Sequence, residues 1–190
     1  MKNILLGIFL FAILSCGGNN DVADTPATAP VTQQVQKPKQ QVKRQQAPAQ
    51  SGPYKAKNEG WLTNMEEAYA LSKKSGKPIM ANFTGSDWCG WCKKLDRSVF
   101  HQPGFEKWAE DNVILLEVDF PKRFRLPQDV AAQNNTLKQA FAVRGFPSIW
   151  VFDAEKDANG SYNFKKLGKT GYTKTLAEFQ TNVGNFIAKR

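Results

Sequence analysis

The sequence predicts an α/β sandwich built around a sheet of mixed strand direction, preceded by a disordered linker. Helix-like and strand-like segments follow one another from Gly60 onward in the order α, β, α, short α, β, α, β, β, α, which is typical of layered α/β domains. The last two strand-like segments are joined by a short turn and should pair as a hairpin. Residues 16–58, in contrast, are rich in Gln, Pro and Lys with few large apolar side chains, so they cannot bury enough surface to order themselves.

The first helix and the first strand of the domain 60–190 follow from local signals. Thr63 and Glu66 have capping-box spacing, and a run of good helix formers then leads to Gly76, which should end the helix. The apolar run 79–83 predicts a short buried strand.

The next segments alternate in the same way. Residues 91–100 predict a helix, with Cys92, Leu95 and Val99 on one face. Pro103 should open a brief helix that reaches Trp108. The run 113–118 has too few polar positions to face water on one side and is predicted to be a central strand.

The remaining segments complete the pattern. We expect an irregular insertion over 120–135, then a helix containing Leu137, Ala140 and Phe141 that ends at Gly145. The other expected elements are a strand at 148–152, a turn at 157–160, a hairpin partner at 162–167, and a terminal helix capped by Thr175 and Glu178 with Leu176, Phe179, Val183 and Ile187 on its apolar face.

The N-terminal residues 1–15 have the features of an export signal. Lys2 supplies a positive start, and the apolar run 4–14 is shorter than the roughly 20 residues of a spanning helix. The segment ending in Leu14-Ser15-Cys16 resembles a bacterial lipobox. It implies that the chain is cut before Cys16 and that this cysteine carries a lipid; an ordinary secretory signal and an uncleaved anchor are the alternatives. The expected location is the bacterial cell envelope, lipid-anchored and facing the periplasm or the cell exterior.

The net charge of +9 does not indicate a nucleic-acid partner. Much of the basic excess lies in the predicted tether 16–58, and no aromatic and basic surface motif accompanies it. A solvated, Pro-stiffened tether that holds the domain away from a membrane explains this composition.

The type and spacing of Cys89 and Cys92 indicate a redox centre that alternates between a dithiol and a disulfide. Two cysteines separated by two residues at the start of a helix can close a disulfide with little backbone movement, and the helix N-terminus lowers the pKa of the first thiol. Cys89 is therefore the candidate nucleophile. The same spacing is half of a zinc site, but with Cys16 lipidated only His101 and carboxylates remain as ligands, so we expect no metal.

Two separated motifs resemble the thioredoxin-like family. They are Asn-Phe-Thr-Gly-Ser-Asp-Trp-Cys-Gly-Trp-Cys-Lys-Lys at 82–94 and Val-Arg-Gly-Phe-Pro-Ser at 143–148, and the similarity is to exported bacterial members with a Trp-Cys-Gly-Trp-Cys active site. The resemblance covers about 60–190 and implies a thioredoxin-like three-layer α/β/α sandwich with a central mixed sheet. It also implies a protein thiol-disulfide oxidoreductase that needs no cofactor beyond the Cys89–Cys92 disulfide. Its partners would be cysteine-containing envelope proteins and another protein that recycles the dithiol.

The resemblance assigns roles to individual residues. Cys89, exposed at the helix start, would attack a substrate disulfide, and Cys92, one turn in and more buried, would resolve the mixed disulfide. Phe146 would offer its backbone to an extended substrate segment, beside a cis peptide bond at Pro147. The residues expected around the cysteines are Trp88, Gly90, Trp91 and Asn82.

Two departures from the family pattern bear on mechanism. Asn82 stands where many thioredoxins have a buried Asp that assists proton transfer, so Glu117, Asp119 or a water would have to replace it. No His lies between the cysteines to stabilise the reduced thiolate, which favours a reductase or isomerase. The alternative function is a lipid-tethered thioredoxin-like binding or holdase module without redox turnover.

Overall fold

The computed structural model describes residues 54–190. The predicted signal 1–15, the lipidation site at Cys16 and the predicted tether up to residue 53 lie outside the described residues. The last tether residues, 54–58, are described and lie against the domain, where Tyr54, Lys57 and Asn58 form hydrogen bonds with side chains far along the chain. The ordered domain therefore starts before Gly60.

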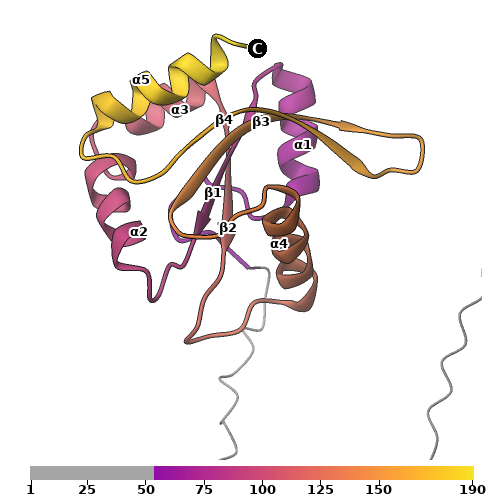
Figure 1. The fold of residues 1–190 in the computed structure, drawn as a ribbon, viewed down its shortest axis with the longest axis horizontal. Helices are drawn as coiled ribbons and strands as arrows, with labels where there is room; N and C mark the ends of the chain where they lie inside the picture. The colour runs from indigo at the N-terminus through magenta and orange to yellow at the C-terminus, as the bar shows by residue number, and fades with distance from the viewer. Residues whose placement is uncertain (1–53) are drawn as a thin grey trace, which may run out of the picture. The chain divides into compact units, whose positions relative to one another are not determined.

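A four-stranded sheet forms the middle of three layers (Figure 1). Its strands are β1 (Ile79–Thr84), β2 (Ile114–Asp119), β3 (Ser148–Lys156) and β4 (Tyr162–Thr170), in the order β2-β1-β3-β4. β1 is parallel to β2 and antiparallel to β3, and β3 is antiparallel to β4. The predicted mixed sheet and the predicted order of elements are both confirmed.

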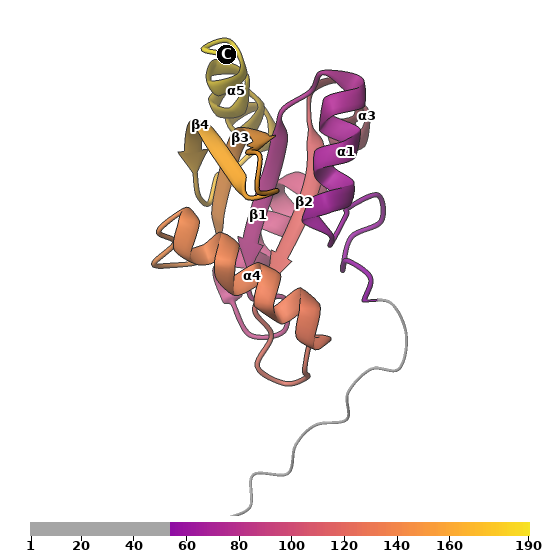
Figure 2. The ribbon, with the colours of Figure 1, turned by 90° about the vertical axis from the view of Figure 1, so that its right-hand side faces the viewer.

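Helices cover both faces of this sheet. One face carries α2 (Gly90–Leu95), its π-helical continuation η1 (Asp96–Phe100), α3 (Phe105–Asn112) and α5 (Leu176–Ile187) (Figure 1). The other face carries α1 (Met65–Ser75) and α4 (Gln128–Ala140), which lie in front of the sheet in Figure 2. Within residues 54–190, no helix is both long enough and apolar enough to cross a membrane.

The alternation of side chains along β1 divides the core into two clusters. Met80 points to the layer of α2, η1, α3 and α5, where it packs in one cluster with Leu95 and Phe179. Its neighbours Ile79 and Ala81 point to the layer of α1 and α4. Because successive side chains of a strand point to opposite faces, Asn82 lies on the same face as Met80, beneath α2.

β2 lies at the edge of the sheet, so the prediction of a central strand for this run was wrong. The run is apolar because helices cover both of its faces, not because strands flank it on both sides. The segment before α1 protects the open edge: Leu62 N–H donates to Leu115 O at 3.0 Å, and Glu117 N–H donates to Leu62 O at 2.8 Å. Leu62 and Leu116 thereby form an isolated parallel bridge.

Several predicted helix ends were also wrong. α1 is capped by Asn64 and not by Thr63, since the Asn64 side chain accepts a hydrogen bond from Glu67 N–H at 3.1 Å. α3 begins at Phe105, after Gly104 in a left-handed conformation (φ 88°), and continues to Asn112.

The expected irregular insertion over 120–135 was too long. α4 begins at Gln128, directly after Pro127, and ends at Ala140, well before Gly145. Asn134, in the middle of this helix, is buried and donates from its side chain to Asp119 O at 2.9 Å. A polar residue that we interpreted as part of a loop thus joins the helix to the sheet.

The C-terminal elements match their predictions in type and order, although β3 and β4 extend beyond the predicted ends at residues 152 and 167. Asp157 and Gly160 form the turn between β3 and β4, with Gly160 at φ 79°. Thr175 caps α5 by accepting from Glu178 N–H at 3.2 Å. Phe179 and Val183 on the predicted apolar face are fully buried.

Candidate active site

A disulfide joins Cys89 and Cys92 at the N-terminus of α2, with 5.3 Å between their Cα atoms. Cys89 is the N-cap residue, and its sulfur accepts a hydrogen bond from Cys92 N–H at 3.2 Å. The turn before it is held by Cys89 N–H, which donates to Gly85 O at 2.8 Å. Backbone N–H groups and the positive end of a helix both favour a thiolate at the Cys89 position.

The two cysteines differ less in exposure than we expected. Cys89 is 5% exposed and Cys92 is 6% exposed, so the expectation of an exposed first cysteine and a more buried second one does not hold for the disulfide form. The difference between them is one of surroundings. Cys92 lines a small polar cavity inside the domain, and Cys89 does not.

Trp88 packs against the turn that precedes Cys89. Its indole N–H donates to Phe120 O at 2.8 Å, and its ring lies so close to Gly85 that a Cβ on that residue would come within 2.5 Å of it. The Lys122 ammonium group lies 3.8 Å from the centre of the same ring. Gly85 therefore allows Trp88 to lie flat over the turn, while 36% of Trp88 is still exposed.

The loop before β3 contains a cis peptide bond between Phe146 and Pro147. The Phe146 ring packs edge-on against Trp88 at 5.9 Å between centroids and stacks on Phe120 at 5.2 Å. This loop and the cysteine turn, 54 residues apart in sequence when counted from Cys92 to Phe146, are thus joined by aromatic contacts.

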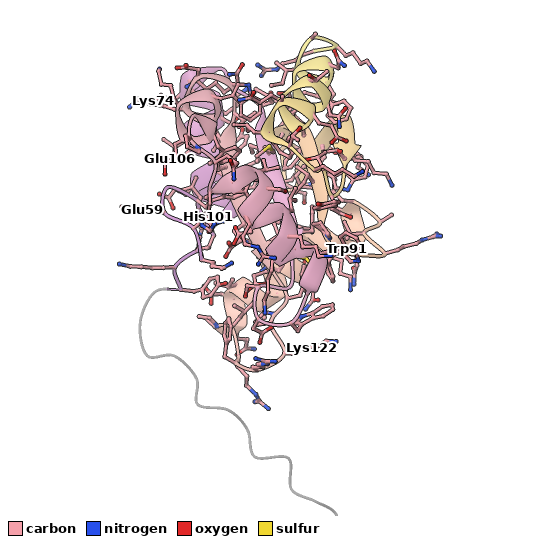
Figure 3. The ribbon with its side chains drawn as sticks, turned by 90° about the vertical axis from the view of Figure 1, so that its left-hand side faces the viewer. Glu59, Lys74, Trp91, His101, Glu106 and Lys122 are labelled. Carbon is pink, nitrogen blue, oxygen red and sulfur yellow. A yellow bond between two sulfur atoms is a disulfide. The ribbon has the colours of Figure 1, made fainter. Side chains whose placement is uncertain are left out.

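Aromatic side chains and cations gather at the mouth of the site. Trp91 is 55% exposed, and its ring centroid lies 5.0 Å from that of Tyr172. The Lys94 ammonium group lies 4.2 Å from the centre of the Trp91 ring. Figure 3 shows Trp91 projecting from the face that carries α2, with Lys122 on the same face. Gly90 leaves open space beside the cysteines, since a Cβ there would meet nothing within 4 Å.

A groove adjoins the cis peptide bond. It has a volume of about 600 Å³ and includes Phe146, Arg144, Trp150 and Lys169 among its lining residues. None of the described residues that line it is acidic. Asp87 is an acidic residue of the cysteine turn, but its carboxylate already accepts hydrogen bonds from backbone N–H groups. The donors are Lys122 N–H at 3.0 Å and Arg123 N–H at 2.5 Å.

Below Cys92 lies a small, partly enclosed polar cavity of about 10 Å³. Asn82 lines it and is buried, and its side-chain oxygen has no hydrogen-bond partner among the described residues. Glu117 lies next to Asn82 in the register of the parallel strands and is 2% exposed. The cavity is also lined by Asp96 and Lys57, whose side chains form a partly buried ion pair with each other.

Burial raises the pKa of Glu117 from its ordinary value of 4.5 to about 7, and the negative charge of Asp119 adds to this increase. Hydrogen bonds from Lys57 N–H and from the Tyr54 hydroxyl act in the opposite direction. Glu117 is therefore a carboxyl group whose charge changes near neutral pH, at a buried position close to the second cysteine.

Sequence reasoning missed Asp96, Lys57 and Tyr54. Asp96 follows Cys92 by four residues, so helical periodicity could have placed both on one face. Lys57 and Tyr54 carried no such signal, because the hydrogen bonds of their side chains join them to residues at least 39 positions away. The described residues contain no group of three or more His, Cys, Asp or Glu side chains arranged to hold a metal.

Comparisons with known proteins agree with this geometry. Residues 65–171 match the family model described as a thioredoxin-like domain. The chain is 35% identical to the disulfide bond reductase DsbH of Chlamydia pneumoniae over 123 residues, which are 65% of this chain and 74% of that protein. It is similar to a solved structure titled DsbH oxidoreductase with a TM-score of 0.59 and 32% identity, covering 74% of this chain and 92% of that one.

A second relative is much longer than the matched region. The chain is 32% identical over 94 residues to the thiol:disulfide interchange protein DsbD of Vibrio vulnificus, but the match covers only 14% of that protein. This similarity therefore concerns one domain of the larger protein.

Proposed function

Because the chain belongs to the thioredoxin-like family and is a thiol-disulfide oxidoreductase, we propose that it reduces disulfides in other proteins through Cys89 and Cys92. The observation that carries this proposal is the Cys89–Cys92 disulfide at the N-terminus of α2, joined to the Phe146–Pro147 loop through Trp88. A cofactor has no step in this chemistry, since the cysteine pair itself carries the two electrons.

The two cysteines have separate roles in the proposed cycle. The thiolate of reduced Cys89 attacks one sulfur of a substrate disulfide, forms a mixed disulfide and releases the other substrate sulfur as a thiolate. Cys92 then attacks Cys89, the bond from Cys89 to the substrate breaks, and the second substrate sulfur leaves. The substrate gains two electrons and the cysteine pair loses them, so another dithiol must reduce the pair for the next cycle.

The direction proposed is reduction. A relative whose match covers 65% of this chain and 74% of its own length is named a disulfide bond reductase. The sequence also has no His between Cys89 and Cys92 that would stabilise the reduced thiolate. Isomerisation uses the same attack by Cys89 without net transfer of electrons. A binding or holdase function without redox turnover is not supported by these relatives.

The surface around the site favours acidic substrate segments. Within residues 54–190, four large hydrophobic side chains are exposed, and three of them are Trp88, Trp91 and Tyr172. The ammonium groups of Lys94 and Lys122 lie over the rings of Trp91 and Trp88. Aromatic surface supplies contact area, and cations attract partners of opposite charge. We expect substrates with Asp or Glu beside the reducible disulfide.

The proposed location is the bacterial envelope, with the chain held to a membrane by a lipid on Cys16. This part rests on the export signal and the lipobox of the sequence. The relatives DsbH and DsbD are named a disulfide bond reductase and a thiol:disulfide interchange protein, and these names agree with a protein that acts on disulfides.

Trapping of mixed disulfides tests the proposed function. The full chain carrying Cys92→Ser, incubated with an oxidised substrate such as insulin, should accumulate a covalent complex that a reducing agent releases. The matched control Cys89→Ser should trap little or none. Equal trapping by the two variants, or failure of the wild-type chain to reduce insulin disulfides, would reject the assignment.

A further inference from the structure

We propose that Glu117 accepts the proton of the Cys92 thiol when Cys92 resolves the mixed disulfide. This inference rests on the proposed function, because it concerns the second half of the same cycle. It assigns a role to a buried carboxyl group on β2, a strand that contributes no cysteine.

The fold places Glu117 under α2. Leu115 of β2 packs in the cluster of α2, η1, α3 and α5, while Leu116 packs in the cluster of α1 and α4. Alternation along the strand therefore turns Glu117 toward α2, as it turns Asn82 on the neighbouring strand. Both side chains and Cys92 line the same small, partly enclosed cavity.

The cavity can connect these groups through one water molecule. Its volume of about 10 Å³ is at the lower limit for a single water, which needs two or more polar partners. The buried Asn82 side-chain oxygen has no partner among the described residues and can accept a hydrogen bond from that water. The Glu117 carboxylate can accept a second one, so the water is aligned to receive the proton of Cys92.

Three carboxylates near Cys92 are buried, and Glu117 is the one whose oxygens accept the fewest strong hydrogen bonds, so it is the most able to take up a proton. The Asp119 oxygens accept from Ser86 N–H at 2.8 Å, from the Ser86 hydroxyl at 2.5 Å, from Phe120 N–H at 2.8 Å and from the Tyr54 hydroxyl at 3.1 Å. Asp119 is thus fully occupied, and it is not among the residues that line the cavity.

Asp96 is occupied as well. One of its oxygens pairs with the Lys57 ammonium group, and the other accepts from the Asn58 side chain at 2.7 Å. Glu117, in contrast, has one strong donor, Lys57 N–H, at 3.0 Å from Oε1 and 3.3 Å from Oε2. The Tyr54 hydroxyl, at 3.4 Å from Oε1, is a weak one.

The charges that face Glu117 keep its proton affinity in a useful range. Burial and Asp119 raise its pKa, while Lys57 and the Tyr54 hydroxyl lower it, and the result is about 7. Asp96 and Lys93, which line the cavity from η1 and α2, are the other charged groups nearby. A proton acceptor is most effective when its pKa lies close to the working pH.

The proposed step balances as follows. The Cys92 thiol gives its proton through the water to the Glu117 carboxylate, and the Cys92 sulfur attacks the Cys89 sulfur. The Cys89–Cys92 bond forms, the Cys89–substrate bond breaks, and the substrate sulfur leaves as a thiolate that solvent protonates. Glu117 returns to the carboxylate form by releasing its proton through the same water.

Single-turnover kinetics of the full chain test the proposal. Reduced protein is mixed with a peptide disulfide, and the formation and the decay of the mixed disulfide are followed separately from about pH 5 to about pH 9. In Glu117→Gln, we expect normal formation by Cys89 but decay slowed about 100-fold at neutral pH, the size typical of a lost proton acceptor. The exposed control Glu110→Gln should decay like the wild type.

The pH profile provides a readout that a purely structural role would not change. Wild-type decay should increase with pH through an inflection near 7 and then level off, whereas Glu117→Gln should lose this inflection and keep accelerating until the Cys92 thiol itself ionises. Asp119→Asn should keep the inflection but move it to lower pH, because one of the charges that raises the pKa of Glu117 is removed.

The outcomes separate this inference from the proposed function. Wild-type decay without an inflection near pH 7, or Glu117→Gln with wild-type decay at all pH values, would overturn the role of Glu117 while leaving the thiol-disulfide function intact. If the wild type forms no mixed disulfide, both fail. If Glu117→Gln does not fold, the wild-type and Asp119→Asn profiles still decide the question.

Discussion

Asn82 and Glu117 lie side by side in register on the parallel strands β1 and β2, and both side chains line the cavity under Cys92. A buried amide next to a buried carboxyl replaces the pattern in which a single acid on the first strand lies below the cysteines. The amide has an unpaired oxygen and the carboxyl is close to its titration point at neutral pH. The site therefore has a polar interior in addition to its cysteine turn.

The first prediction concerns stability and pH. The pKa of Glu117 is higher in the folded protein, about 7, than its ordinary value of 4.5, so the charged form is disfavoured by folding. The contribution of Glu117 to the free energy of unfolding is complete below about pH 4.5 and is lost as the pH increases through 7. A shift of this size corresponds to about 3 kcal/mol. Urea unfolding should show this loss for the wild type.

The comparison with Glu117→Gln checks that prediction. Because Gln has no charge to bury, this variant should lose less stability than the wild type between those two pH values. Parallel pH dependences for the two proteins would mean that Glu117 titrates normally.

The second prediction concerns the partly buried ion pair between Lys57 and Asp96. The Asp96 side chain is 9% exposed and the Lys57 side chain 43%, so Lys57→Met leaves a nearly buried carboxylate with one donor fewer. We expect a loss of about 1–2 kcal/mol in the free energy of unfolding, less than for a fully buried pair because water screens Lys57. The matched control is Lys73→Met, which removes an exposed pair with Glu155 and should leave the unfolding midpoint unchanged.

The third prediction distinguishes the two candidate caps of α1. Asn64→Ala removes the side chain that accepts from Glu67 N–H and should cost about 1 kcal/mol of stability. Thr63→Ala removes only a hydrogen bond to Tyr54 O, at 3.1 Å, and should cost less. Thermal unfolding of the two variants gives the order, and a larger loss for Thr63→Ala would contradict the observed cap.

The fourth prediction concerns Trp88. Trp88→Ala removes the edge-on contact with Phe146 and the hydrogen bond to Phe120 O. We expect kcat/KM for a protein disulfide to decrease about tenfold, in the range of an aromatic contact residue at an interface. Exchange with a small disulfide that makes no contact beyond the sulfurs should change much less. An equal decrease for both substrates would indicate damage to the cysteine turn itself.

Much of the fold could be read from local patterns. The Thr175 cap, the apolar face around Phe179 and the turn at Gly160 depend on residues within a few positions of one another. The cysteine turn also belongs to this class, because Cys89 and Cys92 are three positions apart in one helix start. Such features need no knowledge of distant segments.

The errors arose where distant segments decide the structure. β2 is an edge strand whose open side is covered by Leu62, and α4, which begins at Gln128, is bonded to the sheet through Asn134 and Asp119 O. An apolar strand has the same sequence whether a strand or a short bridge covers its edge. Asn134 likewise has the same side chain in a loop as in a helix.

The sequence by itself determined the family, the order of elements and the cysteine pair, because each is encoded by neighbouring residues or by short motifs. Only the tertiary structure decided what lies beneath Cys92. It brought Glu117, Asp96 and the Tyr54–Asn58 segment together from separate parts of the chain. Burial then altered the proton affinity of Glu117, and burial is a property of the packed domain and not of any one segment.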